Sequence, residues 1–273
     1  MTPKAGNGAT LSLGATPVAL RVAGHFGELM QGRLGADGPL ALISLPCPVL
    51  AVQTGGTGTP GLIGPRRLHR LCVALGLPMP SALPVLSADM PPGGGAGSST
   101  AALVVLARAL GWSGAPEDLA RACVAAEGAS DPLMFPHPEQ LLFAPRRGEV
   151  LLRLPPLPGF EVIGGFLGEG QRTRAEDQDF PDIADLLVDW PGPLARLAAL
   201  ASESARRTLA HRGPAGDPTA ALARDLGASG WLMAHTGSAR GLIFAPGMVP
   251  VQAGAALREA GFSGVVQFTG GGA

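Results

Sequence analysis

A glycine-rich run that leads directly into an apolar helix constrains this chain more than any other stretch. Residues 93–97 contain four glycines, Ser98, Ser99 and Thr100 follow them, and an apolar segment continues to Leu110. A helix that starts here presents unpaired backbone N–H groups and the positive end of its dipole. Because glycines let the backbone approach a ligand closely and adopt positive φ, the run predicts an anion-binding site at the helix start.

Two familiar phosphate-binding loops do not fit this stretch. A Walker A loop needs Lys after its last glycine, but Ser98 follows Gly97. The dinucleotide pattern G-x-G-x-x-G, counted from Gly93, fails because Ser98 stands at the position of its last glycine. A glycine-rich turn before a capped helix is an equally simple interpretation of the local sequence.

The charge composition limits the chemistry of the chain. The sequence has 20 basic and 21 acidic residues and a formal net charge of -1, which does not indicate a nucleic-acid partner. Lys4 is the only lysine. The body of the chain therefore offers no lysine for a P-loop or a Schiff base, and phosphate charge must be met by arginine, backbone amides, a helix end or a metal.

The cysteines and the N-terminus favour a cytoplasmic protein. Cys47, Cys72 and Cys123 are far apart and form no C-x-x-C pair, which predicts reduced, packed thiols; a reactive cysteine is the less favoured alternative. The first 20 residues lack a continuous apolar core, so we expect no signal peptide. The apolar helix over 101–110 is too short to span a bilayer, so we expect no membrane partner.

Hydrophobic patterning predicts alternating strands and helices. In the first part of the chain we expect strands over 18–23, 40–52, 83–88, 140–143 and 149–154, helices over 67–75, 101–110 and 116–127, and a loop over 24–32. The second part is expected to contain strands over 162–166, 231–234, 241–244 and 264–268 and helices over 194–211, 219–226 and 251–260. The proline-rich segment 154–159 predicts a boundary between domains 1–155 and 156–273. The order in the second part fits a ferredoxin-like sheet with helices on one face.

Separate islands of the sequence carry a family resemblance. The pattern Pro-x-x-x-Gly-x-Gly-Ser-Ser-x-Ala at 91–101 resembles the central motif of the GHMP kinases, which phosphorylate small metabolites with ATP. Segment 21–32, with Gly-Glu-Leu-Met-Gln-Gly, is similar to the opening motif of the L-threonine kinases of cobalamin synthesis and propanediol utilisation. Segment 234–242 resembles the C-terminal motif of the family, and Glu127 with segment 130–135 resembles the Glu and Thr-Asp motif of the threonine kinase branch. The resemblance implies an α+β, two-domain GHMP kinase fold with a ribosomal S5 domain 2-like N-terminal half and a ferredoxin-like C-terminal half.

The resemblance also implies roles for individual residues. Asp131 is the implied catalytic residue, which orients the substrate hydroxyl and accepts its proton, and Ser99 and Glu127 are the implied ligands of Mg²⁺. The implied ATP-binding residues are Pro91, Gly93, Gly94, Gly95, Ala96, Gly97, Ser98, Ser99 and Thr100. The implied substrate-binding residues are His25, Glu28, Gln31, His235, Thr236, Gly237 and Ser238. A zwitterionic amino acid would place its ammonium on Glu28 and its carboxylate on neutral donors.

Simpler interpretations stay open for these residues. Glu28 in a glycine loop can merely accept hydrogen bonds from backbone amides, and Asp131 before a proline is a common turn arrangement. Glu127 can be an ordinary acid at a helix end, although the helix dipole disfavours it there. His235 is more simply a hydrogen-bonding residue of a loop than a metal ligand.

No motif assigns a role to two further polar segments. Arg146 and Arg147 are expected at the surface of a turn. The charged segment 171–185 is expected to be a solvated loop, with a mobile flap over the site as the alternative.

The implied function is an ATP- and Mg²⁺-dependent kinase that converts L-threonine to O-phospho-L-threonine for cobalamin side-chain synthesis. The chain departs from the family pattern at Gly94, at Ala102, where the threonine kinases tend to have Asp, and at His25-Phe26, which replaces a small polar pair. The alternatives are a GHMP kinase for homoserine, an isoprenoid or a sugar alcohol, a nucleotide-binding regulator without turnover, and a decarboxylase of the same fold.

Overall fold

The computed structural model describes residues 19–170, 176–235 and 237–272. The strands in these ranges are β1 (Arg21–Arg33), β2 (Leu40–Thr54), β3 (Leu86–Ala88), β4 (Leu141–Ala144), β5 (Glu149–Arg153), β6 (Phe160–Leu167), β7 (Gly230–Met233), β8 (Ala239–Phe244) and β9 (Phe262–Gly270). The α-helices are α1 (Pro65–Leu75), α2 (Ser98–Ala109), α3 (Pro116–Glu127), α4 (Leu194–Arg212), α5 (Thr219–Asp225) and α6 (Ala253–Glu259), and the short 3₁₀ helices are η1 (Pro138–Gln140) and η2 (Ala184–Leu187).

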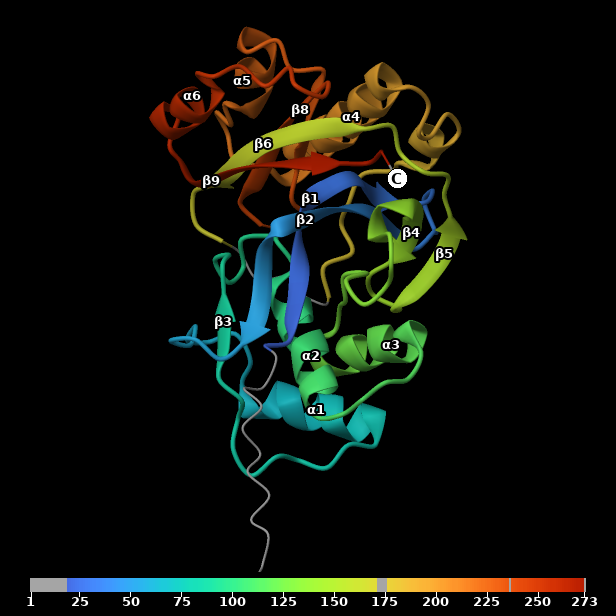
Figure 1. Ribbon diagram of the computed structural model, residues 1–273. Coiled ribbons are helices and arrows are strands. Elements are labelled where there is room, and N and C mark those ends of the chain that lie inside the picture. The colour runs from blue at the N-terminus through green and yellow to red at the C-terminus, as the bar shows by residue number, and fades with distance from the viewer. Residues whose placement is uncertain (1–18, 171–175, 236, 273) are drawn as a thin grey trace, which may run out of the picture.

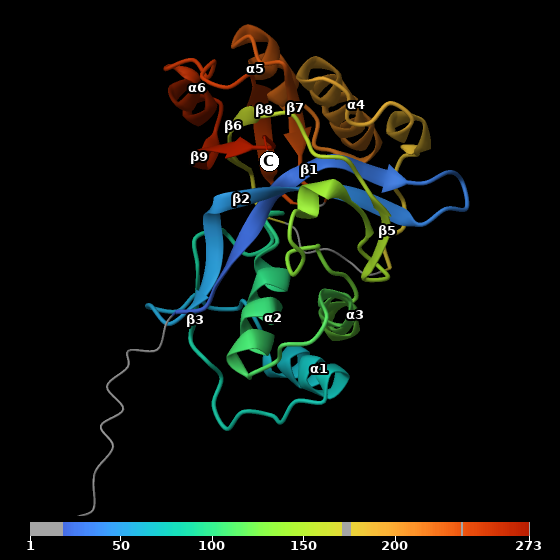
Figure 2. The ribbon, with the colours of Figure 1, turned by 45° about the vertical axis from the view of Figure 1, so that its right-hand side comes forward.

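These strands form one antiparallel sheet that separates two layers of helices. The strand order is β5-β4-β2-β1-β7-β8-β6-β9, and β3 pairs with β2 outside this path. Helices α1, α2 and α3 lie on one side of the sheet, and α4, α5 and α6 lie on the other (Figure 1 and Figure 2). The order β7-β8-β6-β9, with helices between the strands on one face, is the ferredoxin-like arrangement expected for the second half.

The predicted helices and strands are present, with ends that shift by a few residues, but the predicted loop over 24–32 is wrong. This segment continues β1, whose pairing with β2 shifts register at three places between Ala23 and Met30. Glycines usually mark a loop, but here they allow bulges in a long strand. A Cβ at Gly27, which has φ +71°, would lie 2.9 Å from a backbone carbon of Met233, so this glycine also permits close pairing with β7.

The predicted boundary at 154–159 lies between β5 and β6, yet the sheet and the core continue across it. Glu28 of β1 pairs with Met233 of β7. Phe26, which is fully buried, packs edge-on against Phe166 and Phe268 with ring centroids 5.7 Å away in both pairs. A side chain of the first strand thus fills the core of the second half, and the division into domains 1–155 and 156–273 stays a prediction.

A buried hydroxyl ties helix α4 to the central strand. Ser204 Oγ accepts a hydrogen bond from the backbone amide of Gln31 at 2.9 Å and donates one to the backbone carbonyl of Gln31 at 3.3 Å. We expect Ser204→Ala to lower the free energy of unfolding by about 1–3 kcal/mol, because it leaves a buried N–H without a partner. Urea denaturation measures this loss. Arg206→Ala on the exposed face of α4 is the control and should cost no more than about 0.5 kcal/mol; an equal loss in both variants would contradict the assignment.

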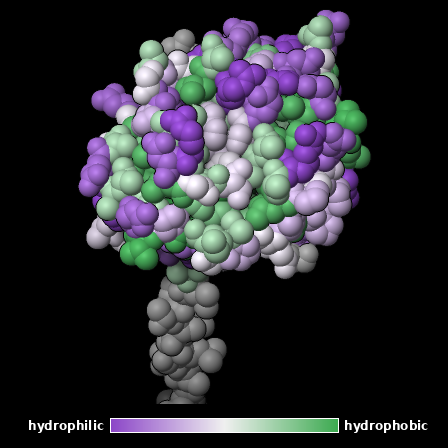
Figure 3. All heavy atoms as spheres, turned by 90° about the horizontal axis from the view of Figure 1, so that it is seen from above, coloured by the Kyte–Doolittle hydropathy of each residue, from purple (hydrophilic) through white to green (hydrophobic). Residues whose placement is uncertain are grey.

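The surface and the cysteines agree with the composition. Seen from the end that carries α4, α5 and α6, hydrophilic and hydrophobic side chains are interspersed (Figure 3). Within the described ranges, none of the helices has the length and apolar character that crossing a membrane requires.

Cys47, Cys72 and Cys123 are free and buried, as predicted, and burial raises the pKa of each thiol, to about 11 for Cys47. They are therefore packed, protonated thiols.

Candidate active site

Two of the motif segments, 21–32 and 234–242, contact the glycine-rich loop, residues 93–97. From segment 21–32, the His25 backbone amide donates to the Ala96 carbonyl at 3.1 Å. From segment 234–242, the Ala239 backbone amide donates to the Gly94 carbonyl at 2.9 Å, and a Cβ at Gly237 would lie 2.3 Å from the Gly95 nitrogen. Segments far apart in the sequence thus hold this loop from two sides, and a side chain at Gly237 would force them apart.

The glycine-rich loop leads into a helix whose first backbone amides are not capped by a side chain of the described residues. Gly97 is the N-cap of α2 with φ 71°, and in the described structure no side chain caps this helix. A Cβ at Gly97 would lie 2.6 Å from His25 Cδ2, so the loop leaves no room for a larger residue here. The first-turn amides of α2 keep their hydrogen-bonding capacity and the helix dipole points the same way, which suits an anion.

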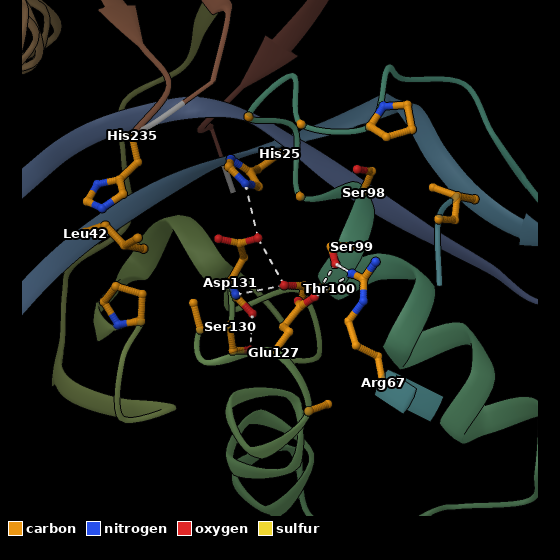
Figure 4. A pocket seen from close by; sticks show the side chains of 18 of the residues that line it. His25, Leu42, Arg67, Ser98, Ser99, Thr100, Glu127, Ser130, Asp131 and His235 are labelled. Carbon is orange, nitrogen blue, oxygen red and sulfur yellow. Dashed lines mark hydrogen bonds and ion pairs between the residues drawn. The ribbon is translucent and has the colours of Figure 1, made fainter. Parts of the chain in front are cut away.

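A cavity of about 380 Å³ opens beside this helix start (Figure 4). Of the residues singled out in the sequence, it is lined by His25, Glu28, Gly93, Gly95, Gly97, Ser98, Ser99, Thr100, Glu127, Asp131 and His235. The first turn of α2, the end of α3, the loop after α3, strand β1 and the loop after β7 therefore all contribute to one space.

Ser99 and Glu127 contact each other at the edge of this cavity. The Ser99 hydroxyl donates a hydrogen bond to Glu127 Oε2. Arg67 of α1 donates from Nη1 to both residues, at 2.8 Å to Ser99 Oγ and 3.1 Å to Glu127 Oε2. Burial raises the pKa of Glu127, although the Ser99 hydrogen bond and the charge of Arg67 oppose that effect. The pair predicted to hold Mg²⁺ is brought together, with an arginine beside it (Figure 4).

Asp131, His25 and Glu28 form a chain of charged groups. His25 Nε2 lies 3.5 Å from Asp131 Oδ2, and His25 Nδ1 lies 3.4 Å from Glu28 Oε1. Thr100 Oγ1 donates to Asp131 Oδ2 at 3.1 Å and accepts from the Asp131 amide at 3.2 Å. One ligand atom from each of His25, Glu28 and Asp131 lies within 4.8 Å of the others, close enough to share a cation, but both ring nitrogens of His25 already face carboxylates. We interpret the cluster as an ion-pair chain.

Burial and charge set the protonation of this chain. Burial lowers the pKa of His25, but the carboxylates of Glu28 and Asp131 outweigh it and raise the pKa to about 9. Burial raises the pKa of Glu28 to about 7, against the opposing effect of His25. Burial also raises the pKa of Asp131, but His25 and the Thr100 hydroxyl overcome it, and the net shift is downward. Near pH 8, Asp131 is an ionised carboxylate beside a protonated imidazole.

His235 is a neutral group that also lines the cavity. Its Nδ1 lies 3.2 Å from Gln31 Oε1, and its ring stacks on Phe180 with centroids 4.0 Å apart. Burial and the nearby charges of Arg146 and Arg212 lower its pKa to about 3. This histidine is therefore a hydrogen-bonding residue, and its Nε2 is buried without a hydrogen-bond partner among the described residues.

The structure places some of the singled-out residues next to the cavity rather than on its wall. These are Pro91, Gly94, Ala96, Gln31, Gly237 and Ser238. Gln31 is fully buried and links His235 to β7 by donating to the Met233 carbonyl at 3.2 Å. Thr236 lies outside the described residues. Their proposed roles are supporting ones, because they position the loops that face the cavity.

Three arginines of the cavity received no role from the sequence motifs. The prediction that Arg146 lies at the surface of a turn is wrong, because Arg146 is partly buried and lines the cavity, whereas Arg147 is exposed. Arg67 and Arg70 of α1 also line it. Their spacing of three residues places both side chains on one face of α1, but nothing in the sequence says that this face lines the cavity.

The charged segment before α4 is not merely solvated. In its described part, 176–185, Phe180 is buried and stacks on His235, and Arg212 lies over the Phe180 ring at 4.3 Å. Arg146 donates to the Asp177 carbonyl at 3.3 Å. The described part of this segment thus packs beside the site, while residues 171–175 lie outside the described ranges.

Solved structures share this fold. The mevalonate kinase of Methanococcus jannaschii matches with a TM-score of 0.62 and 10% identity over 95% of this chain and 99% of that chain. A homoserine kinase from Cytophaga hutchinsonii matches with a TM-score of 0.52 and 14% identity over 96% and 97%. A phosphotransferase related to the CoA biosynthesis pathway matches with a TM-score of 0.58 and 15% identity over 93% and 95%. No family model and no curated protein matches the chain. The α+β fold expected from the sequence is confirmed: it is the fold of the GHMP kinases.

Proposed function

We propose that the protein is an ATP-dependent kinase that transfers the γ-phosphoryl group to the hydroxyl of a small amino acid, with L-threonine as the substrate. The observation that carries this proposal is the convergence of an uncapped helix start and an ionised carboxylate, Asp131, on one cavity. The first feature suits the phosphates of a nucleotide, and the second suits a proton acceptor. The fold is shared with kinases for mevalonate and homoserine, which supports the reaction class.

The residues present fit a magnesium nucleotide. The Ser99 hydroxyl and the Glu127 carboxylate are hard oxygen ligands of the kind that Mg²⁺ prefers, and they stand beside the helix start. The glycine loop and the first-turn amides of α2 would hold the phosphates. Mg²⁺, when bound, supplies charge neutralisation on the phosphate oxygens.

Within this site the chain positions the acceptor and takes its proton. Asp131 accepts the proton of the substrate hydroxyl as that oxygen attacks phosphorus. Thr100 holds one carboxylate oxygen of Asp131 by its hydrogen bond, and protonated His25 keeps the carboxylate ionised at neutral pH. Phosphoryl transfer depends mainly on positioning and charge, so these contacts matter as much as basicity.

An amino-acid substrate fits the charges on the acceptor side. Glu28 lines the cavity, and its Oε2 is buried without a hydrogen-bond partner among the described residues, which suits an ammonium group. Arg146 brings a guanidinium to the same cavity, which suits the substrate carboxylate. The neutral ring of His235 offers a further polar atom at Nε2. Homoserine carries the same two charged groups, so it is the second candidate substrate.

The decisive assay measures ADP release from Mg-ATP with threonine, serine, homoserine and mevalonate. Threonine-dependent release is the expected result. Release with homoserine or mevalonate instead would replace the proposed substrate but keep the reaction. Nucleotide binding without release on any acceptor would favour a regulator and contradict the proposal.

Acceptor binding is expected to depend on pH through Glu28. Its pKa is raised to about 7, so the carboxyl is mostly protonated at pH 6 and mostly ionised at pH 8. Since only the ionised form attracts ammonium, the KM for threonine should fall by roughly tenfold between these pH values. Steady-state kinetics at saturating Mg-ATP measures this effect. The change in KM between pH 6 and 8 reports on the protein, because the amino group of the substrate titrates only at alkaline pH. A KM that stays constant from pH 6 to 8 would show that Glu28 does not bind the ammonium group.

A further inference from the structure

A cation of the chain already contacts the place proposed for Mg²⁺. Arg67 Nη1 lies 2.8 Å from Ser99 Oγ and 3.1 Å from Glu127 Oε2. A metal that binds both oxygens would sit about 2.1 Å from each of them. A nitrogen that bonds both of these oxygens leaves little room for such an ion between them (Figure 4).

Burial explains why a cation belongs there. The Glu127 side chain is only 14% exposed and that of Arg67 is 23% exposed. A carboxylate in such a place is costly unless it is paired. Arg67 supplies the pairing charge, yet its partly exposed side chain reaches the cavity wall on a flexible stem, so its guanidinium can move without unfolding helix α1.

The cavity offers Arg67 a second partner when a nucleotide is present. Arg67 and Arg70 line the same space as Gly95, Gly97 and Ser98, where the phosphates would lie. A guanidinium suits phosphate oxygens because its donors form a planar fork. A divalent ion and a guanidinium repel each other at the Ser99–Glu127 pair, so arrival of one favours departure of the other.

We propose that Arg67 is an exchangeable counter-ion: it neutralises Glu127 in the nucleotide-free protein, yields that place to the divalent cation, and moves onto the nucleotide phosphates. The inference rests on the proposed function. Its consequence is that metal alone binds weakly, whereas metal and nucleotide favour each other's binding.

Direct binding tests the exchange without reference to turnover. Mn²⁺ replaces Mg²⁺ because it takes similar oxygen ligands and its free form gives an EPR signal. We expect Arg67→Gln to bind Mn²⁺ alone at least tenfold more tightly than the unmodified protein, and to bind ADP at saturating Mn²⁺ at least fivefold more weakly by calorimetry. Arg67→Lys, which keeps the charge, should stay closer to the unmodified protein in Mn²⁺ affinity.

Two controls separate exchange from a structural effect. Arg66→Gln alters the exposed neighbour on α1 and should change neither affinity. The gain in Mn²⁺ affinity should vanish in Arg67→Gln/Glu127→Gln, which removes the carboxylate ligand. If Arg67→Gln binds Mn²⁺ no more tightly than the unmodified protein, the inference is overturned even for an active kinase. A gain in Mn²⁺ affinity with weaker ADP binding supports it even if no acceptor is phosphorylated, an outcome that would contradict only the proposed function.

Discussion

Asp131→Asn is expected to lower turnover by about 100- to 10,000-fold, the range that a positioned general base contributes. Asparagine keeps the shape of the side chain and its contacts with Thr100 and His25, but it cannot accept a proton at the attacking oxygen. The affinity for ADP should stay within about twofold, because the glycine loop and the first-turn amides of α2 do not depend on this carboxylate. Single-turnover kinetics with threonine, together with ADP calorimetry, measures both quantities.

The control for this variant is Asp118→Asn on the exposed face of α3, whose side chain is 59% exposed. It should leave both turnover and ADP affinity unchanged. If Asp131→Asn keeps turnover close to that of the unmodified protein, Asp131 is not the proton acceptor. A loss of ADP affinity in parallel with turnover would instead indicate that Asp131 shapes the nucleotide site.

Glu28→Gln is expected to lower kcat/KM for threonine by about 30- to 5,000-fold, the cost of removing one partner of a buried, hydrogen-bonded charge pair. Glutamine has the same shape, but it loses the negative charge that the substrate ammonium requires. The ADP affinity should not change, because Glu28 is a residue of β1 and not of the glycine-rich loop 93–97.

A substrate analogue separates charge recognition from damage to the site. 3-Hydroxybutyrate keeps the hydroxyl and carboxylate of threonine but lacks the ammonium. The unmodified protein should prefer threonine strongly, and Glu28→Gln should lose most of that preference. An unchanged ratio of the two kcat/KM values would show that Glu28 does not bind the ammonium group, whatever the loss in absolute rate.

Residues that begin and end helices, together with the regular spacing of apolar residues, made much of the fold predictable. Pro65 and Pro116 begin α1 and α3, and Gly76 and Gly128 end them with positive φ, as such residues usually do. The error over segment 24–32 has a local cause, since bulges in β1 absorb glycines that elsewhere mark loops. The pairing of β1 with β7 and the register shifts between β1 and β2 could not be predicted from the spacing of apolar residues, because both depend on strands elsewhere in the chain.

The sequence motifs named many residues of the candidate site, but they did not name the charged residues that other segments bring to it. Ser99 and Glu127 are brought together as the resemblance implied, and Asp131 lies beside them in the same cavity. Arg67 and Arg146 come from a helix and a turn with no motif of their own, so only the tertiary structure shows that they face this cavity. Their roles, like those of the residues named from the sequence, remain proposals that the variants above test.

The most direct test of the central claim follows the phosphoryl group itself. The protein is incubated with Mg²⁺, ATP labelled with ³²P at the γ position and L-threonine, and O-methyl-threonine replaces threonine in the parallel reaction. The account predicts labelled O-phospho-threonine in the first reaction and no labelled amino acid in the second, where the hydroxyl is blocked. Label that remains in ATP or appears only as inorganic phosphate, in a protein that binds ATP, would contradict it.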